Sequence, residues 1–286
     1  MLKTKIVHDR ILIVDFGSQV TQLIARRVRE SGVFCEIHPF NKVDPQSLRA
    51  FEPSGIILSG GPASVHEIAP PMADEGVFNL GVPVLGICYG EQTIVKQMGG
   101  DVEPSDHREF GRAFVDIKRT SPLIDGLWDP GKQYQVWMSH GDRINSIPNG
   151  FEIIGTSDGS PFAIIANENK RIYGVQFHPE VVHTPDGAGL LKNFTHEICE
   201  ASGDWTMESF KAEAIESIRN DVGTSRVICG LSGGVDSSVV AVLLSEAIGS
   251  QLTCVFVDHG LMRAKEAEEV VSLFRDHYNI TLVHRN

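Results

Sequence analysis

The sequence predicts an α/β protein with two domains, a mixed-sheet domain followed by part of a doubly wound parallel sheet. Near the N-terminus, short and wholly apolar runs lead into glycine and then into helical periodicity. The middle of the chain changes to closely spaced strand patterns, and a strand–helix–strand–helix–strand run follows it. A chain of 286 residues is also too long for one ordinary core and fits two.

Three apolar runs in the first part of the chain predict strands that are buried on both faces of a sheet. These runs are Arg10–Phe16, Gly55–Leu58 and Val82–Ile87, and glycine follows each within a few residues. Helical spacing of apolar residues follows the first and the third run. Strands that alternate with helices in this way predict a parallel arrangement.

Between about Gly111 and Phe177 the pattern changes to strands, which predicts an antiparallel extension of the sheet. The runs cover residues 112–117, 132–138, 151–156, 161–166 and 171–177. A helix at Gly187–Ala201 can close this first domain, and we place the domain boundary near Gly203. The predicted domains are therefore residues 1–203 and 204–286.

The second domain opens with an amphipathic helix at Thr206–Asn220 and continues as a βαβαβ unit. Its predicted elements are the strand Arg226–Leu231, the helix Val235–Ile248, the strand Leu252–Asp258, the helix Ala264–His277 and the strand Thr281–Val283. A doubly wound sheet is larger than this unit, so we expect the domain to be truncated at Asn286.

Composition disfavours several classes of function. Apolar residues make up 42% and charged residues 22% of the chain, as in soluble globular proteins. No apolar run has the length of a bilayer span and Met1–Lys5 does not open a signal peptide, so we expect a cytoplasmic location and no membrane partner. A net charge of −12 disfavours nucleic acid as a partner. The five cysteines show no CxxC spacing, which disfavours disulfides and a zinc site.

Cys88 has the sequence setting of an activated nucleophile. The segment GICYG (86–90) joins an apolar strand to a helix, and its glycines are expected to let the backbone bend and the substrate come close. The dipole and the unpaired N–H groups of a helix N-terminus favour a thiolate and can receive an oxyanion. A buried cysteine that serves only as a small apolar residue is the alternative.

A thiol nucleophile needs a base, and the base needs a third group to orient it. His178 lies at the end of an apolar strand in the segment QFHPE. Glu180 lies two residues further on, where it can hold the imidazole in its useful tautomer. Of the eleven histidines, His140 in the predicted turn MSHGD is the main competitor, and we rank it second.

Three segments resemble the signatures of the class I glutamine amidotransferases and stand in the order of that family. They are LSGGP (58–62), GICYGEQ (86–92) and VQFHPE (175–180). The resemblance runs from about Arg10 to Ala201. GGP alone is common in ordinary turns, so the three segments together carry the resemblance.

This resemblance implies a role for each site residue. Cys88 is the nucleophile, His178 the general base and acid, and Glu180 the group that orients His178. The backbone N–H groups of Gly61 and Tyr89 form an oxyanion hole. The glutamine pocket is lined by Gln92 and by the turn that consists of Ser139, His140, Gly141 and Asp142.

Glu91 departs from the pattern of the family, in which a large apolar residue, often Met, stands at this position. A carboxylate in the first turn of a helix is stabilising. A carboxylate that points toward Cys88 would instead oppose formation of the thiolate and slow its attack. The sequence leaves both alternatives open.

The segment SGGVDSS (232–238) predicts a phosphate-binding loop that is not a Walker A loop, because it lacks the Gly-Lys-Ser/Thr ending. It lies between a predicted strand and a helix N-terminus, where backbone N–H groups and the helix dipole hold phosphates. Ser232, Ser237 and Ser238 add hydroxyl donors. Asp236 beside phosphate implies a Mg²⁺ ion between them. An N-capped helix after a glycine turn is the alternative.

This loop resembles the pyrophosphate loop of the N-type ATP pyrophosphatases, which split ATP between its α and β phosphates and pass AMP to an acceptor oxygen. Residues 255–263 resemble the second strand and loop of that domain, whose strand end faces the adenosine. No prosthetic group is implied, and Mg²⁺ is placed at Asp236. The implied ATP-binding residues are Ser232, Gly233, Gly234, Val235, Asp236, Ser237, Ser238 and Val257.

An amidotransferase domain followed by a pyrophosphatase domain is the order of the GMP synthetase family, carbon–nitrogen ligases of purine biosynthesis. The resemblance implies glutamine, ATP and xanthosine 5′-monophosphate (XMP) as substrates, with ammonia from glutamine displacing AMP from adenylated XMP. A homodimer is implied only for a longer protein, through a C-terminal region that is absent here. We expect this chain alone to hydrolyse glutamine weakly and not to make GMP.

Other functions stay open at this point. One is an amide-transferring, ATP-dependent ligase with a different acceptor, because the acceptor-binding part is expected beyond Asn286. A second is a stand-alone glutaminase, which the loop at 232–238 argues against. A third is a nucleotide sensor without catalysis, which the intact set of Cys88, His178 and Glu180 argues against.

Overall fold

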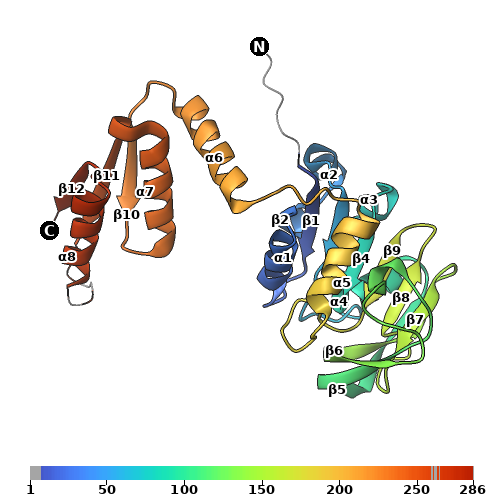
Figure 1. Ribbon diagram of the computed structural model, residues 1–286. Coiled ribbons are helices and arrows are strands. Elements are labelled where there is room, and N and C mark those ends of the chain that lie inside the picture. The colour runs from blue at the N-terminus through green and yellow to red at the C-terminus, as the bar shows by residue number, and fades with distance from the viewer. Residues whose placement is uncertain (1–7, 259, 261–262, 264, 286) are drawn as a thin grey trace, which may run out of the picture. The chain divides into compact units, whose positions relative to one another are not determined.

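The computed structural model describes residues 8–258, 260, 263 and 265–285. It divides into two compact units, a first unit (Met1–Trp205) and a second unit (Thr206–Asn286). Each unit has its own sheet and its own buried apolar core (Figure 1).

The first unit is built on a mixed sheet that has nine strands in the described part of the chain, in the order β2-β1-β3-β4-β9-β8-β7-β5-β6. The parallel strands are β1 (Arg10–Asp15), β2 (Phe34–Pro39), β3 (Gly55–Leu58), β4 (Val84–Ile87) and β9 (Ile172–Val175). The antiparallel part adds β5 (Asp101–Ile117), β6 (Gln133–Ser146), β7 (Glu152–Thr156) and β8 (Ile164–Asn167). The predicted parallel sheet with an antiparallel extension is therefore confirmed. The run at 171–177 was wrongly assigned to the extension, because β9 pairs parallel with β4 and antiparallel only with β8.

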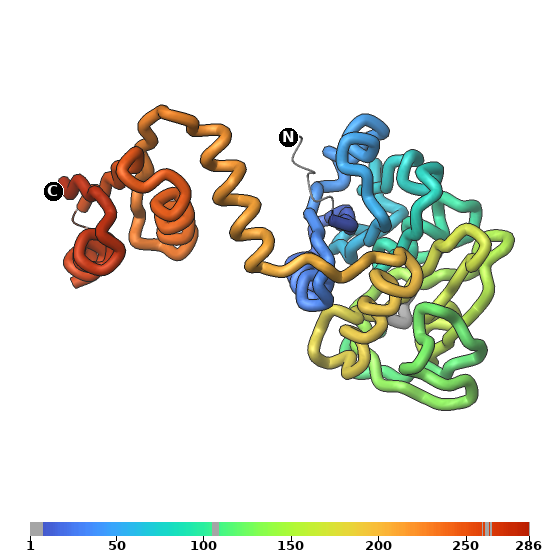
Figure 2. The backbone as a smooth tube through the Cα atoms, turned by 45° about the horizontal axis from the view of Figure 1, so that its top comes forward, coloured from blue at the N-terminus to red at the C-terminus, as the bar shows by residue number. Residues whose placement is uncertain are grey.

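Helices cover both faces of this sheet. Side chains of β1 alternate between two apolar clusters, since Ile11 and Ile13 face one cluster and Leu12 and Val14 face the other. The first cluster includes α1 (Thr21–Glu30) and α5 (Gly187–Lys192), which lie side by side in Figures 1 and 2. The second includes α2 (Pro45–Phe51), α3 (Glu75–Asn79) and α4 (Tyr89–Gln97). After α5 the helix continues with π-type turns over Asn193–Ile198.

The sequence pattern did not predict β2 or α2. β2 lies at the edge of the sheet and has one buried residue, Cys35, so it lacks the continuous apolar run of a central strand. α2 carries a local signal that was overlooked, a capping box between Asp44 and Ser47 with Pro45 at its first position. Short 3₁₀ turns complete the described elements at Phe40–Lys42, Pro122–Ile124 and Gly249–Gln251.

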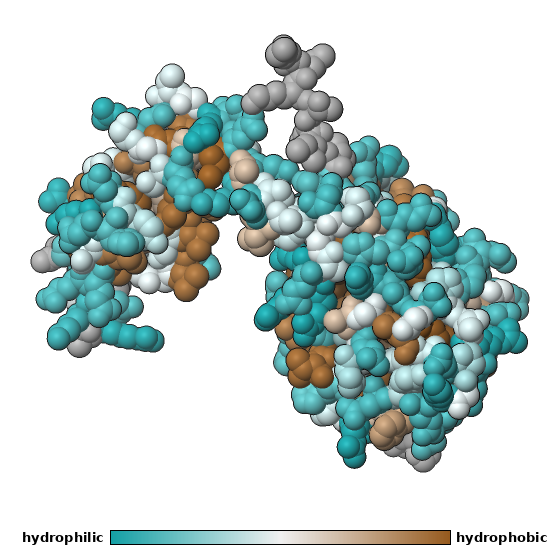
Figure 3. Space-filling model, viewed as in Figure 1, coloured by the Kyte–Doolittle hydropathy of each residue, from teal (hydrophilic) through white to brown (hydrophobic). Residues whose placement is uncertain are grey.

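The second unit has the predicted βαβαβ order. It begins with α6 (Met207–Val222) and continues with β10 (Val227–Leu231), α7 (Val235–Ile248), β11 (Leu252–Val257), α8 (Glu266–Val271), a π-helical continuation at Ser272–His277, and β12 (Leu282–Arg285). The three strands are parallel in the order β10-β11-β12. Right-handed crossovers in this order place α7 and α8 on the same face. Figure 3 shows apolar surface over α7, where Val235, Val239 and Val240 are exposed.

In the described part of the chain, no helix combines the length and the apolar character that a bilayer crossing requires. The segment Met1–Lys5, which gave no signal-peptide pattern, lies outside the described residues.

Candidate active site

Cys88 occupies the sharp turn between β4 and α4. Its backbone has φ 53° and ψ −108°, and only 4% of the residue is exposed. Its N–H donates to the carbonyl oxygen of Val175 on the neighbouring β9 at 2.7 Å. A positive φ at a residue other than glycine is strained, and such strain gathers at functional sites.

The glycines beside Cys88 serve a different purpose from the one expected. Within residues 86–90 the positive φ belongs to Cys88, so the backbone does not bend at Gly86 or Gly90. A Cβ added to Gly90 would lie 2.3 Å from the carbonyl oxygen of Leu58, and one added to Gly86 would lie 2.6 Å from a backbone nitrogen of α4. Close packing of α4 on the sheet therefore requires these glycines.

His178 and Glu180 form a buried pair next to Cys88. The His178 Nδ1 lies 2.7 Å from Glu180 Oε1, and the Glu180 side chain has no exposed surface. Burial alone would lower the pKa of His178, but hydrogen bonds to Cys88 and Glu180 outweigh it and raise the pKa to about 10. The structure thus brings the three predicted catalytic residues together, with His178 between the thiol and the carboxylate.

A cavity of about 300 Å³ opens beside this trio. Its lining includes three predicted site residues besides His178, namely Cys88, Gly61 and Ser139. The sequence reasoning missed the remaining lining residues, which are Gly17, Ser18, Gln19, Val20, Pro62, Trp137 and Val181. The first four form the loop after β1, at the carboxyl edge of the parallel strands, where ligands of such sheets bind.

Both predicted oxyanion donors lie near Cys88. Tyr89 is the first residue of α4, so its N–H has no partner within the helix. The loop that holds Gly61 is close to the catalytic pair, because a Cβ added to Gly60 would lie 3.1 Å from His178 Cε1 and 3.8 Å from Cys88 Cβ. This placement fits the predicted role of the two N–H groups, which remains a prediction.

The predicted glutamine-pocket segment lies in strand β6, so the expected turn at Ser139–Asp142 is wrong. It pairs with β5, which keeps the segment extended instead of turning. The Cys88 Sγ donates to the carbonyl oxygen of Ser139 at 3.5 Å, and Gln92 Nε2 donates to that of Asp142 at 3.2 Å. His140, on the same strand, hydrogen-bonds to Glu109 on β5, and Gly141 lies between His140 and Asp142.

Glu91 is fully buried in the first turn of α4, three residues after Cys88. It packs against β9 at Gly174, where an added Cβ would lie 2.6 Å from Glu91 Cγ. Neither carboxyl oxygen has a hydrogen-bond partner among the described residues. Burial, and then the negative charge of Cys88, raise the pKa of Glu91 well above its ordinary value. Burial therefore favours the uncharged form of this carboxyl, and the solvated first-turn carboxylate is not what the structure shows.

In the second unit, the loop Ser232–Ser238 joins β10 to the N-terminus of α7. Gly233 has φ +78°, which glycine adopts without strain, and no side chain caps the helix. The hydroxyls of Ser237 and Ser238 donate to the Gly234 carbonyl oxygen at 3.1 and 2.8 Å. This leaves the first N–H groups of α7 available to an anion.

The predicted adenosine-side strand ends beside this loop. Leu231 and Phe256 are partners in the parallel register, so Ser232 and Val257 both follow at the carboxyl edge of the sheet. Val257 is the last residue of β11 and is half-exposed. His259, Leu261 and Met262 of the predicted loop lie outside the described residues.

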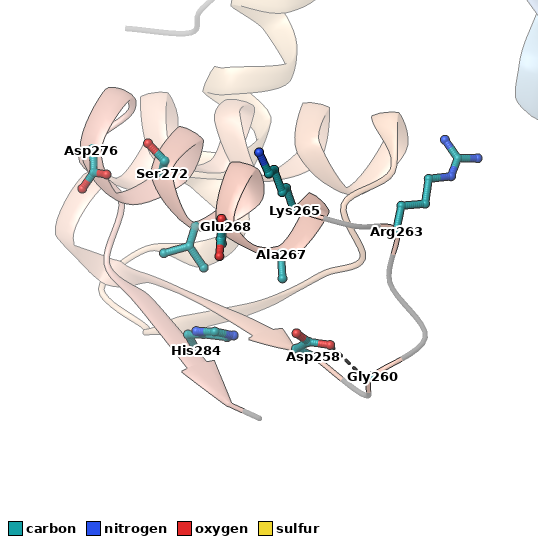
Figure 4. Close-up of a pocket in the computed structure, with 10 residues that line it drawn as sticks. Asp258, Gly260, Arg263, Lys265, Ala267, Glu268, Ser272, Asp276 and His284 are labelled. Carbon is teal, nitrogen blue, oxygen red and sulfur yellow. Dashed lines mark hydrogen bonds between the residues drawn. The ribbon is translucent and has the colours of Figure 1, made fainter.

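A larger cavity, of about 590 Å³, lies between α8 and the ends of β11 and β12 (Figure 4). Asp258, whose carboxylate accepts from the Gly260 N–H at 2.8 Å, lines it together with Lys265 and His284. Neither Cys88 nor the loop Ser232–Ser238 contributes to its lining. Three of its lining residues, Asp258, Gly260 and Arg263, belong to the segment 255–263 that was predicted to lie on the adenosine side.

Comparison with known families identifies the first unit. The family model of class-I glutamine amidotransferases matches residues 12–198. The chain therefore belongs to the class-I glutamine amidotransferase family. A NAD synthase family model matches residues 209–281, which lie in the second unit.

Individual relatives match across both units. The GMP synthase [glutamine-hydrolyzing] of Phenylobacterium zucineum is 65% identical over 277 residues, which are 97% of this chain and 53% of the relative. That of Agrobacterium fabrum is 60% identical over 282 residues, 98% of this chain and 54% of the relative. A solved structure from Thermoplasma acidophilum, described as one component of a GMP synthase, is 32% identical with a TM-score of 0.58 and covers 68% of this chain and 95% of its own. This chain thus spans about half the length of the two GMP synthases.

Proposed function

We propose that this chain contains the glutaminase half, and the start of the ATP-activating half, of a glutamine-dependent GMP synthase. One observation carries the proposal: the buried Cys88–His178–Glu180 arrangement and the loop Ser232–Ser238 occur in one chain. That chain matches GMP synthases over nearly its whole length. Residues 1–203 are the amidotransferase domain and residues 204–286 the first part of the ATP pyrophosphatase domain. The reaction takes place in the cytoplasm.

The first half-reaction releases ammonia from glutamine. The Cys88 thiolate attacks the amide carbon, and the N–H groups of Gly61 and Tyr89 receive the oxyanion. His178, whose raised pKa keeps it protonated at neutral pH, gives its proton to the departing ammonia. It then takes a proton from the water that hydrolyses the glutamyl thioester, which regenerates the thiol and releases glutamate.

Glu180 orients His178 throughout this cycle. Its bond to Nδ1 directs the other ring nitrogen toward Cys88 and stabilises the imidazolium. Of the proposed glutamine-binding residues, Ser139 lines the cavity beside Cys88. Gln92, His140, Gly141 and Asp142 lie beyond that lining and bind or support the glutamine from there, and Gln92 donates to the Asp142 carbonyl oxygen.

The second half-reaction joins that ammonia to XMP. ATP phosphates bind at the N-terminus of α7, held by the N–H groups and hydroxyls of Ser232, Gly233, Gly234, Val235, Asp236, Ser237 and Ser238, and Val257 faces the adenosine. AMP is transferred to the 2-oxygen of XMP, and ammonia then displaces AMP to give GMP. The transfer of ammonia from the first half-reaction to the second must be shielded from water, because protonation by water gives ammonium, which is not nucleophilic.

The residues near the phosphate loop fit a Mg²⁺ ion. Asp236 lies exposed in the first turn of α7, and Ser237 and Ser238 follow it in the sequence, so the side-chain donors of this loop are all oxygen, as Mg²⁺ prefers. Asp236 would hold the ion, which would neutralise phosphate charge when bound. No prosthetic group is needed for either half-reaction, and no nucleic acid or membrane takes part. A homodimer is proposed for the longer protein only.

Two assays test this function. Wild-type chain should release ammonia from glutamine, whereas a Cys88→Ala variant should not. Ammonia release by both proteins, or by neither, would refute the proposed glutaminase function. The longer protein should convert XMP, ATP and glutamine to GMP and AMP, and an Asp236→Ala variant should lose this synthesis but keep glutaminase activity. Failure with XMP and success with another acceptor would favour a different amide-transferring ligase.

A further inference from the structure

A second histidine–carboxylate pair lies on the strands that carry the glutamine-pocket wall. Glu109 on β5 and His140 on β6 are partners in the antiparallel register. The His140 Nε2 lies 3.3 Å from Glu109 Oε2. The His140 side chain is 1% exposed and that of Glu109 is 20% exposed, so the pair is largely removed from water.

Hydrogen bonds at both ring nitrogens fix the orientation of His140. The His140 Nδ1 lies 3.0 Å from the carbonyl oxygen of Asp142, which can only accept, so Nδ1 carries a hydrogen. Its Nε2 faces a carboxyl group that also accepts from the Ser157 hydroxyl at 3.2 Å. His140 is thus held at both ring nitrogens, by the Asp142 carbonyl oxygen on its own strand and by Glu109 on β5.

This pair lies next to two backbone carbonyl groups, those of Ser139 and Asp142, that accept hydrogen bonds from Cys88 and from Gln92 of α4. Ser139 and Asp142 flank His140 on β6, and their carbonyl oxygens accept from Cys88 Sγ and Gln92 Nε2. The Asp142 carbonyl oxygen thus receives bonds from His140 on one element and Gln92 on another. A shift of His140 would move this carbonyl and the strand segment next to the cavity.

We propose that Glu109 is a positioning residue for the glutamine pocket, which acts by holding His140 and through it the segment Ser139–Asp142. It does not line the cavity beside Cys88 and takes no part in the bond-forming steps. The inference rests on the proposed glutaminase and adds a residue on β5 to it. The sequence pattern gave no sign of Glu109, because its partner stands 31 residues away.

Two variants of Glu109 separate this role from a general structural one. In Glu109→Gln the amide N–H can donate to a neutral His140, which keeps the contact, whereas Glu109→Ala removes it. Glu109→Ala should raise the KM for glutamine by about tenfold, with kcat much less affected. Glu109→Gln should stay near wild type. Glu103→Ala removes the same charge from an exposed position of β5 and should change nothing.

Alkylation of Cys88 provides an independent measurement. Iodoacetamide should react with wild type and Glu109→Ala at similar rates, while glutamine should protect the variant less. Equal KM values for Glu109→Ala and wild type would refute the role of Glu109 but leave the proposed function intact. An equal rise in KM in Glu109→Ala and Glu109→Gln would have the same consequence. Wild-type chain without ammonia release and without glutamine protection would overturn the proposed function, and the inference with it.

Discussion

Replacement of Glu91 by methionine should stabilise the first unit, and more so as the pH rises. The carboxyl of Glu91 is fully buried, and its two oxygens have no hydrogen-bond partner among the described residues. An unsatisfied buried polar group costs about 1–3 kcal/mol. Methionine has a similar length and no polar oxygens, so Glu91→Met should recover a free energy of that order even at pH 5.

The pH dependence follows from the raised pKa of Glu91. In the unfolded chain the carboxyl loses its proton near the ordinary value of 4.5, but in the folded protein burial holds the proton to a much higher pH. Above 4.5 the folded state therefore binds more protons than the unfolded state, and the stability of wild type falls as the pH rises. The loss is about 1.4 kcal/mol per pH unit until the folded pKa is reached.

Urea unfolding at pH 5, 6, 7 and 8 measures this effect. The three tryptophans, Trp128, Trp137 and Trp205, all lie in the first unit, so their fluorescence reports on the unit that contains Glu91. Glu91→Gln is the matched variant, because it keeps a polar group but cannot ionise, and its stability relative to wild type should also grow with pH. Glu197→Gln, at an exposed position, should be neutral. A stabilisation by Glu91→Met that is the same at pH 5 and pH 8 would refute the reasoning.

Three further predictions concern the catalytic trio and its support. Cys88→Ala removes the hydrogen bond that raises the pKa of His178 most, so this pKa should fall from about 10 in an NMR titration, and an unchanged value would contradict the contact. Glu180→Gln should lower the glutaminase kcat by about 10²–10⁴-fold with unchanged circular dichroism, and activity near wild type would argue against an orienting role. Gly174→Ala should destabilise the protein by about 1–3 kcal/mol, because its methyl group would lie 2.6 Å from Glu91 Cγ. Adding Glu91→Ala to Gly174→Ala should recover most of that loss of stability. If the effects of the two substitutions on the free energy of unfolding in urea simply add, the two residues do not compete for space.

The grouping of Cys88, His178 and Glu180 was predictable because each of them stands in a short segment with a recognisable local pattern. Cys88 follows an apolar strand and opens a helix, and Glu180 stands two residues from His178. Their approach to one another depends on the pairing of β4 with β9, which are far apart in the sequence. The run at 171–177 was assigned to the antiparallel extension, so its parallel pairing with β4 was not predicted. The sequence pattern does not specify which strands are neighbours.

Residues whose setting is made by distant contacts could not be placed in the same way. His140 lies in the predicted segment, but its partner Glu109 comes from another strand, and the segment is extended because β5 pairs with it. Glu91 occupies the first turn of α4, where a carboxylate is usually solvated, yet β9 covers it at Gly174. The local prediction of a turn is wrong for the His140 segment, whereas the helix that carries Glu91 was predicted correctly. In both cases tertiary packing decides the setting of the side chain.

The backbone of Cys88 shows how packing holds a strained nucleophile in place. A φ of 53° at this residue costs about 1–3 kcal/mol, and relaxation of the turn would remove that cost. Relaxation is opposed from two sides, because the Cys88 N–H is bonded to Val175 and the backbone at Gly90 rests against Leu58 without room for a methyl group. The strain is therefore balanced by contacts with β3 and β9, the strands on either side of β4. The G-x-C-x-G pattern accordingly marks a close approach of helix and sheet around a residue that itself makes the turn.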